Sequence, residues 1–127
     1  MRLVRERDSA VVVEDLEDAH SFTARFLGLM GRRRLAPGAG LWLEPCNSIH
    51  MAFMRFAIDV LFLSGGRSGK RLQDGDAAEV VAVKAGVRPW IGMAWCSKAS
   101  STLELPAGRA ASCDVRVGDR LRVEVRR

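Results

Sequence analysis

The sequence predicts a mainly β fold, a β-sandwich or jelly-roll-like barrel with one α-helix near the N-terminus. Short β-branched runs recur between turn residues along most of the chain, and only one stretch shows a long helical period. The final segment alternates strictly: Leu121, Val123 and Val125 are separated by charged residues, as in a strand with one buried face. The length of 127 residues predicts one domain over residues 1–127.

The first elements along the chain are a strand and a helix. Ala10–Val13 is a β-branched run and is typical of a short strand. Asp15 is a suitable N-cap, and Gly31 a suitable C-cap, for a helix between them. The apolar residues of this segment recur at steps of three and four and predict one buried helical face: Leu16, Ala19, Phe22, Phe26, Leu27 and Met30.

The remaining elements are mostly short strands. Ala107–Ser112 predicts one helical turn, Val117–Asp119 a turn, and the long Gly- and Ser-rich stretch Ser64–Asp76 a loop. Trp90 follows Pro89, and we expect it to anchor a loop against the sheet. The predicted strands are Leu41–Leu43, Ile49–Phe56, Ile58–Leu63, Glu79–Ala85, Thr102–Leu105 and residues 120–126.

Composition and charge exclude several classes of protein. With 48% hydrophobic and 28% charged residues, the chain is not expected to be disordered. No apolar run approaches the roughly 20 residues of a membrane span, and no apolar stretch of a signal peptide follows the charged start. Three separated cysteines without a CxxC motif indicate reduced thiols, and we expect a cytoplasmic protein without a membrane partner.

The net charge of +5 raises the question of nucleic acid as a partner. The basic residues are mostly dispersed, and Arg32–Arg34 is the one tight run. No aromatic residues interleave with that run, as a stacking platform for bases would require. Nucleic-acid binding is therefore not the favoured prediction, although a basic interaction module for nucleic acid or an acidic partner stays open as an alternative.

Several motifs together resemble one family. They are Gly28-Leu29-Met30, Gly40-Leu41-Trp42-Leu43, the segment from Ile49 to Val60, the Leu-Glu-Leu-Pro-Ala-Gly stretch at 103–108 and Val117-Gly118-Asp119. In this order and spacing they are similar to the DUF192 family, a group of small prokaryotic domains of unknown function. The resemblance covers about Leu16 to Val123. It implies a jelly-roll-like β-sandwich with one helix packed on it, and it implies no particular reaction or cofactor.

Four ionisable residues lie inside otherwise apolar strands: His50, Arg55, Asp59 and Glu104. A charge among apolar residues is costly unless it is paired or used. The leading hypothesis is that these four line a cleft that binds a small polar ligand without catalysis. The structural alternative is that Arg55 pairs with Glu104, or that Asp59 accepts a hydrogen bond from a backbone amide.

Cys46 and His50 have a spacing that allows metal binding or a thiol with its base. In a straight strand, residues four apart lie roughly 13 Å from each other, so the pair requires a turn at Pro45–Ser48. His20, Cys96 and Cys113 are the other residues able to complete a metal site. A metal- or thiol-dependent enzyme that uses Cys46 and His50 is therefore a second hypothesis, and the oligomeric state is left open.

Overall fold

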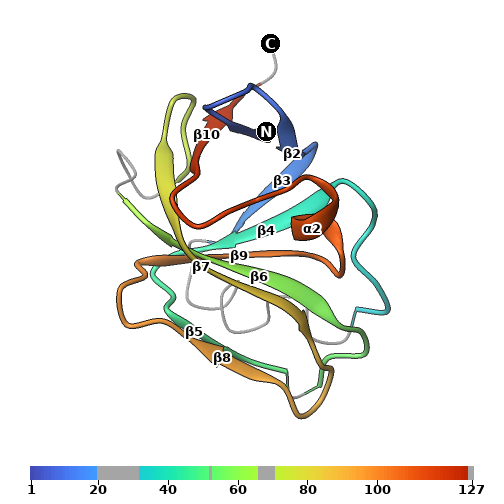
Figure 1. Ribbon diagram of the computed structural model, residues 1–127. Helices are drawn as coiled ribbons and strands as arrows, with labels where there is room; N and C mark the ends of the chain where they lie inside the picture. Colours follow the sequence, from blue (N-terminus) through green and yellow to red (C-terminus); the bar gives the residue numbers. More distant parts are fainter. Residues whose placement is uncertain (20–31, 52, 66–70, 126–127) are drawn as a thin grey trace.

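The computed structural model describes residues 1–19, 32–51, 53–65 and 71–125, and it is mainly β (Figure 1). One short helix, α2, spans Arg109–Ser112. Within the described residues, no helix combines the length and the apolar character that crossing a membrane requires. The strands are β1 (Arg2–Arg5), β2 (Val11–Val13), β3 (Asp15–Ala19), β4 (Ala39–Leu43), β5 (Ser48–His50), β6 (Ile58–Ser64), β7 (Ala77–Val87), β8 (Met93–Trp95), β9 (Ser101–Pro106) and β10 (Arg120–Glu124).

Eight of these strands form one large sheet in the order β2-β1-β10-β7-β6-β9-β4-β3. Neighbours pair in antiparallel fashion, except β3 and β4, which run parallel from Asp15↔Ala39 to Ala19↔Leu43. The predicted mainly β class is therefore confirmed. Strands β5 and β8 form a separate two-stranded sheet.

The large sheet is not closed into a barrel, and that part of the prediction is wrong. Its two edges are β2 and β3, which follow each other with only Glu14 between them. A single connecting residue does not reverse the chain, so the two strands cannot lie side by side and complete a ring. A backbone hydrogen bond instead connects β3 with the residue before β1: the Leu16 N–H donates to the Met1 carbonyl at 2.9 Å.

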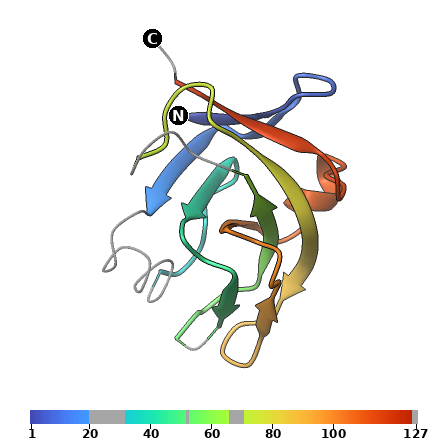
Figure 2. The same ribbon diagram turned by 90° about the vertical axis from the view of Figure 1, so that its left-hand side faces the viewer.

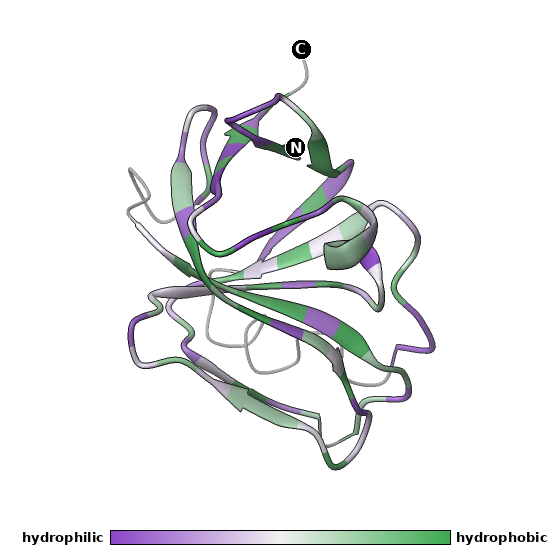
Figure 3. Ribbon diagram, viewed as in Figure 1, coloured by the Kyte–Doolittle hydropathy of each residue, from purple (hydrophilic) through white to green (hydrophobic). Residues whose placement is uncertain are grey.

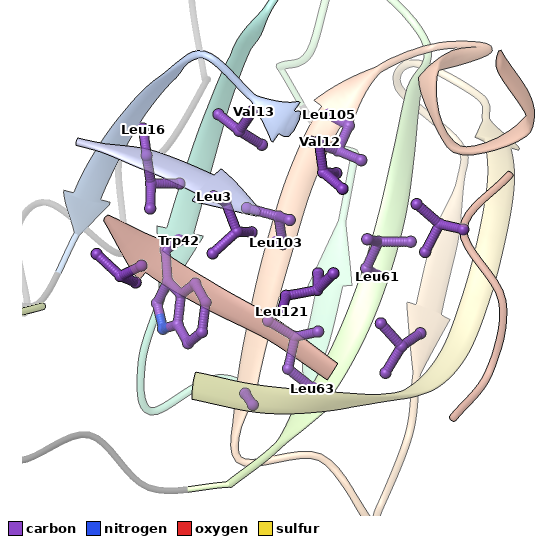
Figure 4. Close-up of a cluster of buried hydrophobic side chains, with 14 of the residues drawn as sticks. Leu3, Val12, Val13, Leu16, Trp42, Leu61, Leu63, Leu103, Leu105 and Leu121 are labelled. Atoms are coloured by element: carbon purple, nitrogen blue, oxygen red, sulfur yellow. The ribbon is translucent and has the colours of Figure 1, made fainter. Parts of the chain in front are cut away.

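The first hydrophobic core lies where the sheet curls over itself. Figure 4 shows Leu3, Val12 and Leu121 from β1, β2 and β10 facing Leu61 and Leu103 of β6 and β9. Trp42 is the largest buried side chain of this core, at 2% exposure. A Cβ on Gly40 would lie 2.9 Å from the Val13 side chain, so this glycine lets β4 approach β2 closely.

A second core lies on the opposite face of β4 and β6. Leu41, Val60 and Phe62 point to it, and the two-stranded sheet covers it with Ile49 and Ala94. The central strands are thus covered on both faces, which suits the continuous apolar run of β6, and Figure 3 shows β6 mostly in the hydrophobic colour. Figure 2 shows β8 beside the end of β7.

The helix predicted to begin at Asp15 is wrong in its first part. Asp15–Ala19 is strand β3, and the rest of the predicted helix, residues 20–31, lies outside the described residues. Leu16 and Ala19 are three positions apart, a spacing that fits one face of a helix. In the strand they belong to opposite cores, because the described sheet buries both of its faces at this point. The described helix is α2, in the C-terminal half, where a helical turn was expected.

Three further strand predictions need correction. The strand expected over Ile49–Phe56 ends at His50, and Phe53 has a positive φ of 66° that no regular strand contains. Strands β1 and β8 were not predicted, because β1 is surrounded by charged residues and β8 has only three residues. Expectations for β2, β4, β6, β7, β9 and β10 are confirmed within a few residues at their ends.

Candidate functional site

Two loops form one exposed tip below the second core. Residues 51–57 follow β5 and residues 88–92 precede β8. The Met51 carbonyl accepts a hydrogen bond from the Trp90 N–H at 2.8 Å, and the Met51 N–H donates to the Gly92 carbonyl at 2.9 Å. The rings of Phe53 and Trp90 meet edge to face with centroids 5.7 Å apart. The two loops are therefore held together by both backbone and aromatic contacts.

The tip places large apolar side chains in water. Trp90 is 57% exposed and Ile91 76%, so the expectation that Trp90 packs against the sheet is wrong. Its φ of 68° turns the chain so that its ring meets Phe53, itself 62% exposed, rather than the core. Soluble proteins seldom collect exposed aromatic groups in one place without a binding role.

The outer face of the two-stranded sheet continues this surface. His50 lies opposite Met93, and Ser48 lies opposite Trp95. Because side chains alternate along a strand, the inward positions Ile49 and Ala94 complete the second core while these four face outward. Met93 is 69% exposed and Trp95 70%.

A groove of about 630 Å³ lies between β7 and β8. Its walls include Val83, Lys84, Val87 and Arg88 from β7 and its following loop, and Met93 and Trp95 from β8. Val83 and Val87 are half-buried, whereas Lys84 and Arg88 are exposed. The volume falls within the usual range of small-ligand pockets, about 300–1,000 Å³. The groove is open, mostly apolar, and flanked by cations.

The charge around the groove has one sign. Residues 45–58 and 80–103, here called the acid-free lobe, contain no Asp or Glu. Four exposed cations lie in this lobe: Arg55, Lys84, Arg88 and Lys98. None of them takes part in the ion pairs of the described residues, which involve Arg2, Arg5, Arg7, Arg32, Arg116, Arg120 and Arg122. Their charge is therefore available to an anionic partner.

Asp59 has a structural environment. It is 1% exposed, and its two carboxylate oxygens accept hydrogen bonds from the Gly86 and Ala110 N–H groups, each at 2.9 Å. Gly86 has a φ of 61° at a bulge in β7, and Gly108 has a φ of 88° at the start of α2, so the carboxylate connects two places whose backbone favours glycine. The structural alternative of a backbone amide partner is confirmed for this residue.

Glu104 faces the other side of the large sheet. Asp59 lies opposite Leu105 and points to the first core, whereas Glu104 lies opposite Val60 and Leu41 and points to the second. It is 7% exposed, and its Oε2 atom has no hydrogen-bond partner among the residues that the structure describes. Burial raises the pKa of Glu104 to about 7, partly opposed by the charge of Arg32.

His50 and Arg55 are both exposed, on the outer face of β5 and in the tip loop. The alternative ion pair between Arg55 and Glu104 is absent from the described ion pairs, because one side chain is in water and the other is buried. The structure thus brings His50 and Arg55 to the acid-free lobe. It places Asp59 and Glu104 on opposite faces of the sheet.

Cys46 lies in the bend that the sequence required at Pro45–Ser48. Its thiol donates to the Ser48 carbonyl at 3.1 Å, and its own carbonyl accepts a hydrogen bond from the Thr102 hydroxyl at 2.9 Å. It borders a shallow hollow of about 260 Å³ whose lining contains no acid or base. Among the described residues no three His, Cys, Asp or Glu side chains form a metal-binding group, and His20 is not among those residues.

The sequence interpretation missed most of the groove residues. Lys84, Arg88, Ile91, Met93 and Trp95 were not selected, because each looks ordinary by itself. The feature of the sequence that identifies them is the absence of acidic residues from the segments around them. All 15 acidic residues fall outside two segments that hold four cations and two of the three tryptophans.

The comparisons agree with this fold. A family model described as "Uncharacterized ACR", DUF192, matches residues 3–123. The chain belongs to the DUF192 family. The sequence resemblance is therefore confirmed, and this family membership does not carry a reaction or a ligand with it. None of the curated proteins matches the chain.

Two solved structures are similar to this DUF192 protein. A protein of unknown function from Novosphingobium aromaticivorans has a TM-score of 0.78 and 19% identity, over 97% of this chain and 84% of that one. A Sinorhizobium meliloti protein named "putative transcription regulator" has a TM-score of 0.73 and 24% identity, over 94% and 88% of the two chains. At these identities the likeness establishes the fold alone.

Proposed function

We propose that this protein is a non-catalytic binding domain whose groove between β7 and β8 holds a ligand with an anionic group and an apolar part. The observation that carries the proposal is the coincidence of unpaired cations with exposed aromatic groups around one groove. Lys84 and Arg88 would contact the anionic group, and Met93 and Trp95 the apolar part. A binding role suits the lobe because its four cations and the rings of Phe53, Trp90 and Trp95 do not belong to the described cores.

The four residues selected from the sequence have separate roles in this proposal. His50 lies next to Met93 on the outer face, and Arg55 lies two residues after Phe53 in the tip, so both border the binding surface. Asp59 accepts hydrogen bonds from Gly86 of β7 and from Ala110 of α2, and so has a structural role. Glu104 belongs to the second core rather than to the surface.

The test uses the three tryptophan indole N–H signals in a two-dimensional NMR spectrum. Phenylacetate, an anionic and aromatic probe, is titrated beside its neutral counterpart phenylacetamide. We expect phenylacetate to shift the signals of Trp90 and Trp95 and to leave that of Trp42, buried in the first core, unchanged. Equal shifts from the neutral probe, or none from either, would contradict the proposal.

A double variant assigns the anion contact. Lys84→Ser with Arg88→Ser should weaken phenylacetate binding by about 1.4- to 5-fold per cation, the range for exposed ion pairs of about 0.2–1 kcal/mol. Arg33→Ser with Arg34→Ser is the matched control, because both are exposed arginines outside the lobe and outside the described ion pairs. Added salt should reduce the difference between the two double variants.

A further inference from the structure

The groove is bordered by two strand edges. β7 has 11 residues, but β10 pairs with it only between Ala77 and Glu79. The Val80 N–H donates to the Asp119 carbonyl, and the Val80 carbonyl accepts a hydrogen bond from the Gly118 N–H. From residue 81 to Val87, the described strands pair with β7 only on the β6 side. Among the strands that the structure describes, β8 pairs with β5 alone.

We propose that the ligand of this groove is an extended acidic segment of a partner protein, which adds to the free edge of β7 as a further strand. This inference rests on the proposed function and names its ligand class. An unpaired strand edge presents alternating N–H and carbonyl groups, and an extended peptide is the partner that satisfies both kinds. The free part of β7 covers seven residues, and the five from residue 81 to Ala85 precede the bulge at Gly86, which gives roughly 17 Å of extended edge.

The side chains around this edge specify the character of the peptide. Lys84 and Arg88 lie four positions apart with no acidic residue nearby in the lobe, so they complement acidic side chains on the peptide. Val83, Met93 and Trp95 offer apolar contacts between them. A segment that alternates acidic and apolar residues presents both sets at once, because its side chains point to opposite faces.

Other partners fit these observations less well. A nucleic-acid backbone and a lipid headgroup offer anionic acceptors, which would leave the outward carbonyls of β7 unpaired. A flat bilayer would meet the tip rather than enter a groove of about 630 Å³. A second copy would bring two acid-free lobes of the same charge together.

The experiment uses the full chain and a capped seven-residue peptide that alternates glutamate with valine. Binding is followed by fluorescence of a label on the peptide and by amide hydrogen exchange of the protein. We expect saturable binding and at least tenfold slower exchange of outward amides between residues 81 and 87. The second probe is the same peptide with alternate backbone nitrogens methylated, which keeps its charge and side chains but removes its strand hydrogen bonds. We expect it to bind at least tenfold more weakly.

A charge reversal tests specificity in the same assay. Lys84→Glu with Arg88→Glu should lose the glutamate peptide and gain a matching lysine–valine peptide. Arg33→Glu with Arg34→Glu should keep the original preference. All four positions are exposed, so the folded state should survive, which a circular dichroism spectrum checks.

The outcomes separate this inference from the proposed function. If the methylated peptide binds as well as the parent and phenylacetate still binds in the groove, strand addition is overturned while anion binding stands. If neither the peptides nor phenylacetate bind, both fall. Tighter binding of oligothymidylate or of phosphatidylserine vesicles than of the glutamate peptide also overturns the peptide inference. So does a dimer in sedimentation that the peptide fails to dissociate.

Discussion

The two ends of the molecule use charge in opposite ways. At the end formed by β1, β2, β10 and α2, here called the paired end, arginines are matched by carboxylates: Arg5 bonds to Asp8, and Arg7 to Asp119 at 2.8 Å. In the acid-free lobe, the four cations have no ion pair among the described residues. The charges of the paired end are therefore part of the fold, and those of the lobe are available for binding. Mutations at the paired end should therefore lower stability, whereas mutations in the acid-free lobe should weaken ligand binding.

The largest effect is expected at Arg5, which is 4% exposed. Its guanidinium donates to Asp8 and to the carbonyls of Cys113 and Asp114, and lies 3.8 Å from the buried Asp119. Arg5→Met should lower the free energy of unfolding by about 3–5 kcal/mol, because it removes the buried cation beside Asp119 and the donor to the Cys113 carbonyl. Urea denaturation measures this. The matched variant Arg88→Met should change stability by less than about 0.5 kcal/mol, and equal losses would refute the comparison.

The next effect concerns Asp59, which connects β6 to the bulge at Gly86 in β7 and to α2. Asp59→Ala leaves the buried Ala110 N–H and the partly buried Gly86 N–H without an acceptor, at about 1–3 kcal/mol for the first and less for the second, so we expect a loss of about 2–4 kcal/mol. Asp74→Ala is the control, because this exposed carboxylate accepts a single N–H, that of Val125. A small effect of Asp59→Ala would show that the backbone at Gly86 and at α2 keeps its conformation without this carboxylate.

The third prediction is a pH dependence caused by Glu104. Its pKa is about 7 in the folded protein and about 4.5 when unfolded, so between these values the folded state keeps a proton that the unfolded state has lost. Stability should therefore fall as pH rises from 4.5 to 7 and stay low above it, by roughly 3 kcal/mol in total. Glu104→Gln should remove this fall in urea denaturation series at several pH values. Identical profiles for both proteins would place the ionised carboxylate in a solvated site.

The smallest change in stability is expected in the lobe itself. Trp95→Ser with Met93→Ser removes two exposed side chains from the outer face of β8, so stability should change by less than about 0.5 kcal/mol per site. The same variant should lose the phenylacetate response in the NMR titration. A large drop in the midpoint of thermal unfolding would assign these residues to the fold rather than to recognition.

Much of the fold could be predicted where a strand carries its own pattern. β10 alternates and β6 is a continuous apolar run, and both lie where expected. The three-residue spacing of Leu16 and Ala19 fits one face of a helix, and it also fits a strand that is buried on both faces. The apolar period therefore predicted a helix where the structure has strand β3. β8 was not predicted, because the sequence does not show which way its side chains face. Met93 and Trp95 have the apolar character of core residues, but both are exposed in the structure.

The candidate site divides in the same way. The cost of burying charge correctly marked Asp59 as a residue that needs partners, and its two amide donors supply them. The same argument selected Glu104. Because side chains alternate along the paired strands β6 and β9, however, Glu104 points to the face of the sheet opposite to Asp59. Residues four or more positions apart share a cleft only if the chain path brings them together, which no spacing in the sequence specifies.

The sequence by itself determined the β class, the main strands, the family and the absence of acidic residues from two segments, because each depends on local composition or order. Only the tertiary structure decided that β5 and β8 stand apart from the large sheet, that β7 keeps a free edge, and that Trp90 and Trp95 face water. These depend on pairing between strands distant in sequence, whose partners are chosen by the packing of two cores rather than by any one segment.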